Sequence, residues 1–131
     1  MKRQMGSVTR FLSSTYTVTN AWASVGFSFI VPKSGFYEIY TELTPRFTNN
    51  NALAGGYIRF TVNNIKVGNI TPCKGSVATT FDFYNTLSKT IRKIYLYKGQ
   101  IVDVEAIYDT NAFTILYSSG NYESSLSLIK E

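Results

Sequence analysis

Histidine is absent from this chain of 131 residues, and cysteine occurs only once, at Cys73. Without histidine the chain lacks the commonest general base and metal ligand, and a Ser-His or Cys-His nucleophile is excluded. A single cysteine also excludes an intrachain disulfide and leaves a zinc site without its usual ligands. We therefore expect no cofactor and no metal, and we expect Cys73 to be a small buried hydrophobic residue.

Charged residues make up only 16% of the sequence, and no apolar run approaches the ~20 residues that a membrane helix needs. The net charge is +5, but the basic residues are scattered, with no run longer than a pair such as Lys2-Arg3. Nucleic-acid-binding proteins usually cluster such charge on one face, so we predict no nucleic-acid partner. A solvated basic surface is the simplest interpretation, and a mild attraction to anionic glycans is the alternative.

Carboxylate pairs are few and poorly placed for catalysis. Glu38 and Glu42 share one face of an expected strand, but such positions stand ~13 Å apart, too far for a glycosidase. Asp103 and Glu105 stand about 7 Å apart, which catalysis permits, although charge on a solvated strand face is far commoner. The same pair, with oxygens from residues 109–111, offers calcium ligands, but no dense aspartate loop accompanies it. We predict that the protein is not an enzyme.

Hydrophobic residues make up 44% of the chain and aromatic residues 15%, with ten tyrosines and nine phenylalanines. This composition and length are typical of one globular domain with a substantial core. Tyrosine suits strands, and it is also common at interfaces, where its hydroxyl stays hydrated.

Strand-like alternation dominates the pattern, and no helix-length window has a helical period. Apolar residues alternate along residues 25–31, 36–43, 57–62 and 101–108, which predicts these inward-facing residues: Val25, Phe27, Phe29, Val31, Tyr37, Ile39, Thr41, Leu43, Ile58, Phe60, Val62, Val102, Val104 and Ala106. Further strands are expected at residues 65–67, 76–83, 90–97, 113–117 and 125–129. Strands at about this spacing, with turns between them, indicate a sandwich or a barrel.

Turn signals separate these strands. Asn63-Asn64 is a plausible two-residue hairpin turn, because asparagine tolerates positive φ. Residues 45–56 contain three successive asparagines and the pair Gly55-Gly56, so we predict the longest loop there. Residues 109–111 form a second predicted loop.

Three segments resemble one family of β domains. Residues 29–37 resemble the "F-x-x-P-x-x-G-x-Y" stretch of complement-1q globular-head and tumour-necrosis-factor-like jelly rolls. Residues 98–104 are similar to the family's "K-G-D-x-V-x-V" turn and strand, and residues 125–129 to its closing strand. The resemblance covers residues 15–131. It implies an all-β antiparallel jelly-roll sandwich that assembles as a homotrimer, with aromatic residues of one sheet near the threefold axis.

The sequence holds more outward-facing aromatics than a monomer needs. If Ile94 and Leu96 face the core, Tyr95 and Tyr97 face away from it. Together with two other surplus aromatics these are the predicted trimer-interface residues: Tyr57, Tyr95, Tyr97 and Tyr117. The alternative is that they cover the second sheet of the sandwich. Trp22 also has two interpretations, a stacking platform for a sugar or a cap over the sandwich.

These features predict a non-enzymatic virion module: a trimeric bacteriophage head-fibre, tail-fibre or decoration protein. Residues 1–14 would be a flexible docking segment for capsid or tail proteins, and residues 15–131 the single domain. No export signal follows the basic start, which favours a virion location over an extracellular one, and we predict no membrane insertion. Host glycans or receptors would contact two candidate loops: Thr48, Asn49, Asn50, Asn51, Asp109, Thr110 and Asn111. The alternative is a soluble complement-like or cytokine-like ligand for a protein receptor.

Overall fold

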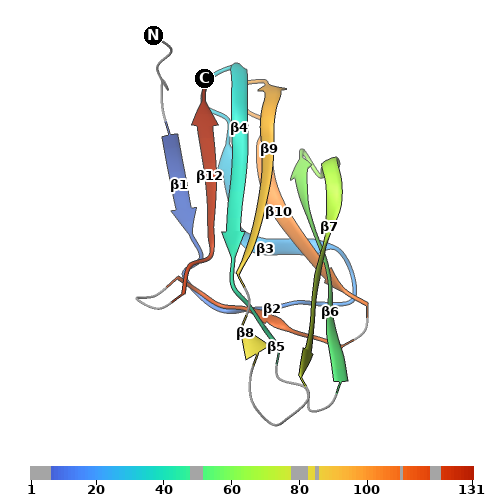
Figure 1. Ribbon diagram of the computed structural model, residues 1–131. Coiled ribbons are helices and arrows are strands. Elements are labelled where there is room, and N and C mark those ends of the chain that lie inside the picture. The colour runs from blue at the N-terminus through green and yellow to red at the C-terminus, as the bar shows by residue number, and fades with distance from the viewer. Residues whose placement is uncertain (1–6, 48–51, 78–82, 85, 110, 119–121) are drawn as a thin grey trace.

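The computed structural model describes residues 7–47, 52–77, 83–84, 86–109, 111–118 and 122–131. Every regular element in these ranges is a strand (Figure 1). The bounds are β1 Ser7–Phe11, β2 Tyr16–Thr17, β3 Ala23–Ile30, β4 Gly35–Leu43, β5 Pro45–Phe47, β6 Ala52–Val62, β7 Ile65–Val77, β8 Phe83–Tyr84, β9 Leu87–Leu96, β10 Ile101–Tyr108, β11 Thr114–Ile115 and β12 Ser125–Lys130. No helix in the described part of the chain is long and apolar enough to cross a membrane.

Two four-stranded sheets form the sandwich. The first sheet has the order β1-β12-β4-β9, and the second has the order β3-β10-β6-β7. A smaller sheet, β2-β11-β5-β8, lies at one end (Figure 1). All the pairings among the described strands are antiparallel. The non-consecutive order of neighbours and the all-antiparallel pairing agree with the predicted jelly roll.

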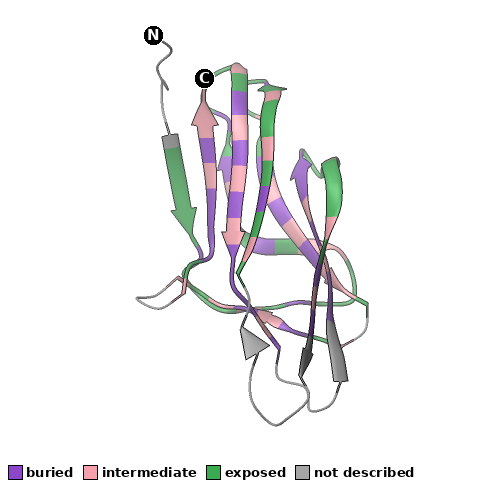
Figure 2. Cartoon of the chain, viewed as in Figure 1, coloured by how far each residue is buried: buried purple, intermediate pink, exposed green. Residues whose placement is uncertain are grey.

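The core lies between the two sheets, and the predicted alternation is confirmed. Strand β4 alternates between buried and partly exposed residues along its length (Figure 2). Each predicted inward-facing residue is buried, with Ile39, Phe60 and Val104 fully excluded from solvent. Such alternation arises because successive side chains of a strand point to opposite faces.

Buried hydroxyl groups fasten β12 to the end of β4. The Thr41 hydroxyl donates to the Ser125 carbonyl at 2.6 Å, and the Thr44 hydroxyl donates to the Glu123 carbonyl at 2.8 Å. The Thr44 amide donates to the Ser124 hydroxyl at 3.1 Å. These bonds satisfy polar groups that would otherwise be costly to bury.

The β6–β7 hairpin turns as predicted at Asn63 and Asn64. Their φ angles are +49° and +67°, the left-handed values that a two-residue hairpin turn of this kind requires. The Asn63 side-chain oxygen also accepts a hydrogen bond from the Ile101 amide at 2.8 Å. The turn therefore ties the hairpin to the start of β10.

The long loop predicted for residues 45–56 is wrong. Pro45 opens β5, where a proline is tolerated as the first residue, and β6 already begins at Ala52. Only residues 48–51 separate the two strands, and they lie outside the described residues. Gly55 and Gly56 lie within β6 and pair with β7, and Gly56 also pairs with β10. Glycine suits these positions because neighbouring main chains approach closely.

The domain begins earlier than residue 15. Residues Ser7–Phe11 form β1, one of the two edge strands of the first sheet, and Leu12 is buried in the core. The predicted flexible segment therefore contains part of the fold, and residues 1–6 lie outside the described residues. The strand expected at residues 76–83 also falls largely outside them, although β7 ends at Val77 and β8 starts at Phe83.

Candidate functional site

An aromatic cluster occupies the outer face of the first sheet, where β4 and β9 run side by side. Phe36 and Tyr95 meet edge to face, with ring centres 5.1 Å apart at 88°. Tyr95 and Tyr97 are also 5.1 Å apart, at 64°. The exposed fractions of these three residues are 45%, 43% and 62%. They form what we call the aromatic cluster: Phe36, Tyr95 and Tyr97.

Strand register and a tight turn position this cluster. Phe36 pairs with Tyr95 across β4 and β9, so both side chains stand on the same face. Leu96, between the two tyrosines, is buried, which confirms that Tyr95 and Tyr97 face away from the core. The Gln100 side chain accepts a hydrogen bond from the Tyr97 amide at 2.8 Å, which holds the turn after β9.

The ammonium group of Lys93 lies 4.7 Å from the centre of the Phe36 ring. This cation–π contact adds a positive charge beside the cluster. The cluster is therefore an apolar aromatic surface with a basic margin, which is typical of an interface rather than a catalytic site.

The structure brings together only two of the four predicted interface tyrosines. Tyr57 lies on β6 in the other sheet, partly buried, with the Lys74 ammonium 4.8 Å from its ring centre. Tyr117 is 48% exposed and follows β11, away from the pairing of β4 with β9. Sequence reasoning missed Phe36. The alternation along residues 36–43 is the signal that places Phe36 on the outward face, but only the pairing of β4 with β9 places it opposite Tyr95.

The candidate ligand loops are only partly described. Thr48, Asn49, Asn50, Asn51 and Thr110 lie outside the described residues. The two ends of the second loop, Asp109 and Asn111, are held against the sandwich. The Asp109 carboxylate pairs with the Lys74 ammonium at 2.9 Å. The Asp109 amide donates to the Gly55 carbonyl, and the Gly55 amide donates to the Asn111 carbonyl.

Asp103 and Glu105, the pair considered for both catalysis and calcium, are engaged by protein groups. Asp103 accepts hydrogen bonds from the Ser24 hydroxyl at 3.0 Å and the Val104 amide at 2.8 Å. Burial raises the pKa of Asp103 above its usual value. Glu105 forms an ion pair with Arg59 at 2.7 Å. Within the described ranges, no three histidine, cysteine or acidic side chains gather closely enough to hold a metal.

Trp22 also contacts Arg59, whose guanidinium lies 4.2 Å from the centre of the indole ring. This guanidinium occupies one face of the ring, the kind of surface on which a sugar would stack. Trp22 is partly buried beside the second sheet, so this arrangement agrees better with a structural role than with a sugar platform.

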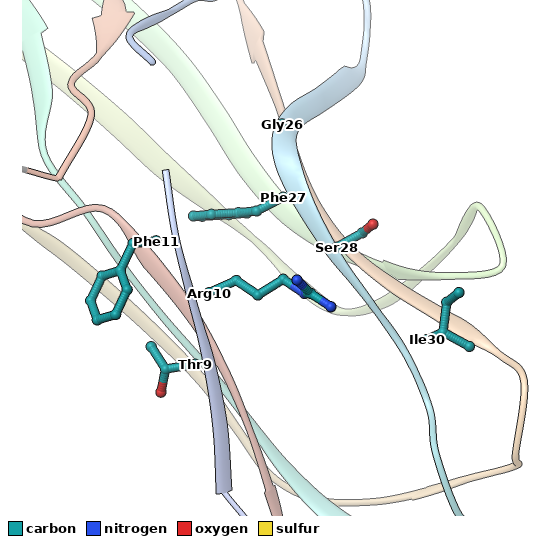
Figure 3. Close-up of a pocket in the computed structure, with 7 residues that line it drawn as sticks. All are labelled: Thr9, Arg10, Phe11, Gly26, Phe27, Ser28 and Ile30. Carbon is teal, nitrogen blue, oxygen red and sulfur yellow. The ribbon is translucent and has the colours of Figure 1, made fainter. Parts of the chain in front are cut away.

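A cleft of about 730 Å³ lies between the edge strands of the two sheets, β1 and β3. Arg10 extends across it from β1 toward β3, whereas Thr9 and Phe11 point the other way (Figure 3). The Arg10 guanidinium lies 5.0 Å from the centre of the buried Phe29 ring. Arg10 therefore covers the open side of the core with its stem and keeps its charge in water.

Cys73 is buried, and burial raises the pKa of its thiol to about 12. A thiol of this pKa holds almost no thiolate at neutral pH, and the thiolate is the reactive form. We expect an aromatic disulfide reagent to leave Cys73 unmodified at about pH 8 in the native protein. In denaturant one equivalent should react, measured by absorbance. Rapid native reaction would contradict the buried position.

Comparisons with known proteins support the fold. No family model matches the chain, and no curated protein sequence matches it. Among solved structures, the chain is similar to an Eiger TNF from S. frugiperda, with a TM-score of 0.51 and 11% sequence identity. The similarity covers 93% of this chain and 94% of that chain. At this identity the likeness shows the fold alone, a TNF-like jelly roll.

Proposed function

We propose that this chain is a non-enzymatic binding module that works as a homotrimer. The observation that carries the proposal is the aromatic cluster, Phe36, Tyr95 and Tyr97, exposed together on one sheet face. The homotrimer is what the family resemblance of residues 29–37 and 98–104 implies. In this assembly the occupant of the cluster is another copy of the same chain.

Physical chemistry favours covering this surface. Soluble monomers rarely expose contiguous apolar patches of large side chains, and interface cores are enriched in tyrosine and phenylalanine. Phe36 and Tyr95 are already packed edge to face, so little side-chain entropy remains to be lost on association. Lys93 at the margin restricts the orientations that a second copy can take without placing like charges together.

A double substitution, Tyr95→Glu with Tyr97→Glu, tests the assembly. We expect the unchanged protein to scatter light at micromolar concentration as a species of three times the 14.7 kDa chain mass. The double variant should be monomeric, because two buried carboxylates would lie unpaired at the interface. Ile65→Lys is the matched control, since Ile65 is 70% exposed and lies at the hairpin of the second sheet. A monomeric unchanged protein would refute the trimer.

We propose two alternative biological roles for this module. The first is the virion: a trimeric fibre head or decoration protein whose loops contact host glycans or receptors. Mass spectrometry and cryo-electron microscopy of purified particles test it, and absence of the chain from particles that carry its gene would refute it.

The second candidate is a soluble ligand for a protein receptor. The specific observation in its favour is the likeness to Eiger TNF over nearly the whole of both chains. Immobilised trimer should then retain a membrane-protein ectodomain, and the monomeric double variant should bind it much more weakly because avidity is lost.

A further inference from the structure

Lys89 is a buried cation on the edge strand β9, and the residue is only 9% exposed. The ammonium group donates hydrogen bonds to the Asn69 carbonyl at 2.5 Å and to the Thr71 hydroxyl at 2.6 Å. It also lies 5.6 Å from the centre of the Phe60 ring. Each of these protein partners is electrically neutral.

The charge of Lys89 has no carboxylate beside it in the described part of the chain, where its partners are the carbonyl, the hydroxyl and the ring. An ammonium group has three donors, and hydrogen bonds to Asn69 and Thr71 use two of them. Burial, with a smaller contribution from the nearby Lys66, lowers the pKa of Lys89. Burying the Lys89 ammonium group without an anionic partner costs free energy, and the positive charge of Lys66 nearby adds to that cost.

A β-bulge builds the wall opposite Lys89. Ile58 pairs with Thr71 and Phe60 pairs with Val67, so residues 68–70 of β7 bulge out opposite a single residue of β6. Gly68 has a φ of +72°, and a β-carbon there would lie 3.0 Å from a methyl group of Ile91. The Asn69 carbonyl in this bulge reaches Lys89 of β9, and bulges of this kind often re-aim groups at functional sites.

An open cleft of about 480 Å³ lies between this bulge and residues 88–91 of β9. Lys89, Asn69 and Thr71 all line it, and Ile91 supplies an apolar wall. The cleft thus combines a cation with a spare donor, neutral polar groups and enough volume for one charged monosaccharide-sized group. Oxyanions suit such a site, because charge-assisted hydrogen bonds to ammonium groups are the strong ones.

We propose that this cleft binds one compact oxyanion, a sulfate, phosphate or carboxylate, either free or carried on a glycan. The third N–H of Lys89 donates to the anion, and the positive charge of Lys66, whose ammonium group donates to the Gly68 carbonyl of the bulge at 3.4 Å, strengthens the attraction. The binding neutralises the buried charge, so the anion stabilises the folded protein. The site does not depend on the trimer, because it uses the edges of β7 and β9 rather than the aromatic cluster.

Titration calorimetry and thermal unfolding test the site with four probes: inorganic sulfate, inorganic phosphate, glucuronate and a sulfated disaccharide. Chloride at equal ionic strength is the reference. We expect at least one probe to bind and to raise the melting temperature, since a ligand that binds only the folded state stabilises it. Binding of the inorganic ions identifies a free-anion site, and binding of the sugars alone identifies an anionic glycan. No binding of any probe would overturn the proposal.

Lys89→Met keeps the length of the side chain and removes its charge, and it should weaken binding by roughly tenfold or more. Lys98→Met, at an exposed turn lysine, is the matched control and should bind as the unchanged protein does. If Lys89→Met fails to fold, Lys66→Gln leaves Lys89 in place and should weaken binding more modestly; binding that Lys66→Gln leaves unchanged would then count against the site. Equal binding by unchanged protein and a folded Lys89→Met would overturn the proposal, whatever the oligomeric state.

Discussion

Replacing Gly56 with alanine is expected to prevent stable folding. Gly56 lies in β6, where it pairs with Tyr108 of β10 on one side and with Cys73 of β7 on the other. A β-carbon at this position would overlap the carbonyl oxygen of Ile107 and stand 2.6 Å from the Tyr108 α-carbon. These atoms belong to the main chain, so relief requires the central strands of the second sheet to separate.

We expect Gly56→Ala to lower the free energy of unfolding by more than about 4 kcal/mol, a loss that few single substitutions cause. Chemical denaturation followed by circular dichroism measures it. Gly99→Ala is the matched control: Gly99 has a φ of +90°, but no atom lies within 4 Å of the position that a β-carbon would occupy there. This control carries only backbone strain, about 1–2 kcal/mol, and should fold. If the two variants lose the same unfolding free energy, β6 does not pack as closely against β10 as described.

Truncating Ile39 to alanine should be the second most damaging change. Ile39 lies in β4, between β12 and β9, and is fully excluded from solvent. Removing its buried methyl and methylene groups loses transfer free energy and leaves a cavity that strands on both sides cannot easily fill. We expect a loss of about 2–5 kcal/mol in unfolding free energy, measured by urea denaturation.

Ile65→Ala provides the control with the same change in chemistry. Ile65 is 70% exposed at the hairpin that joins β6 and β7, so its truncation should change stability by no more than about 0.5 kcal/mol. Similar losses for the two variants would mean that β4 is not at the centre of the core. A change in the slope of the denaturation curve would instead indicate an altered unfolded or native state.

In the aromatic cluster, local sequence pattern predicts which way the side chains point but not which strands bring them together. The alternation of Ile94 to Tyr97 correctly predicts that Tyr95 and Tyr97 face away from the core, because side-chain direction in a strand follows a period of two residues. Phe36 joins them only through the register of β4 against β9. Tyr57, predicted for the same surface, belongs to the other sheet.

The surroundings of Gly55, Gly56 and Lys89 depend more heavily on distant parts of the chain. Gly55-Gly56 has the composition of a loop because glycine is common in turns, yet it lies where adjacent strands come too close for a side chain. Lys89 has the sequence surroundings of any surface lysine, because β9 alone does not show that a bulge in β7 covers it. In each case the deciding atoms come from a strand distant in the chain.

The sequence by itself determined the strand class, the inward faces and the Asn63-Asn64 turn, since each depends on side-chain alternation or on the φ preference of one residue. The tertiary structure alone decided which strands distant in the sequence are neighbours. That choice joins Phe36 to Tyr95, packs Gly56 against Ile107 and places Lys89 beside Asn69. These pairings arise from burial summed over both sheets, a long-range energy that no short window of sequence contains.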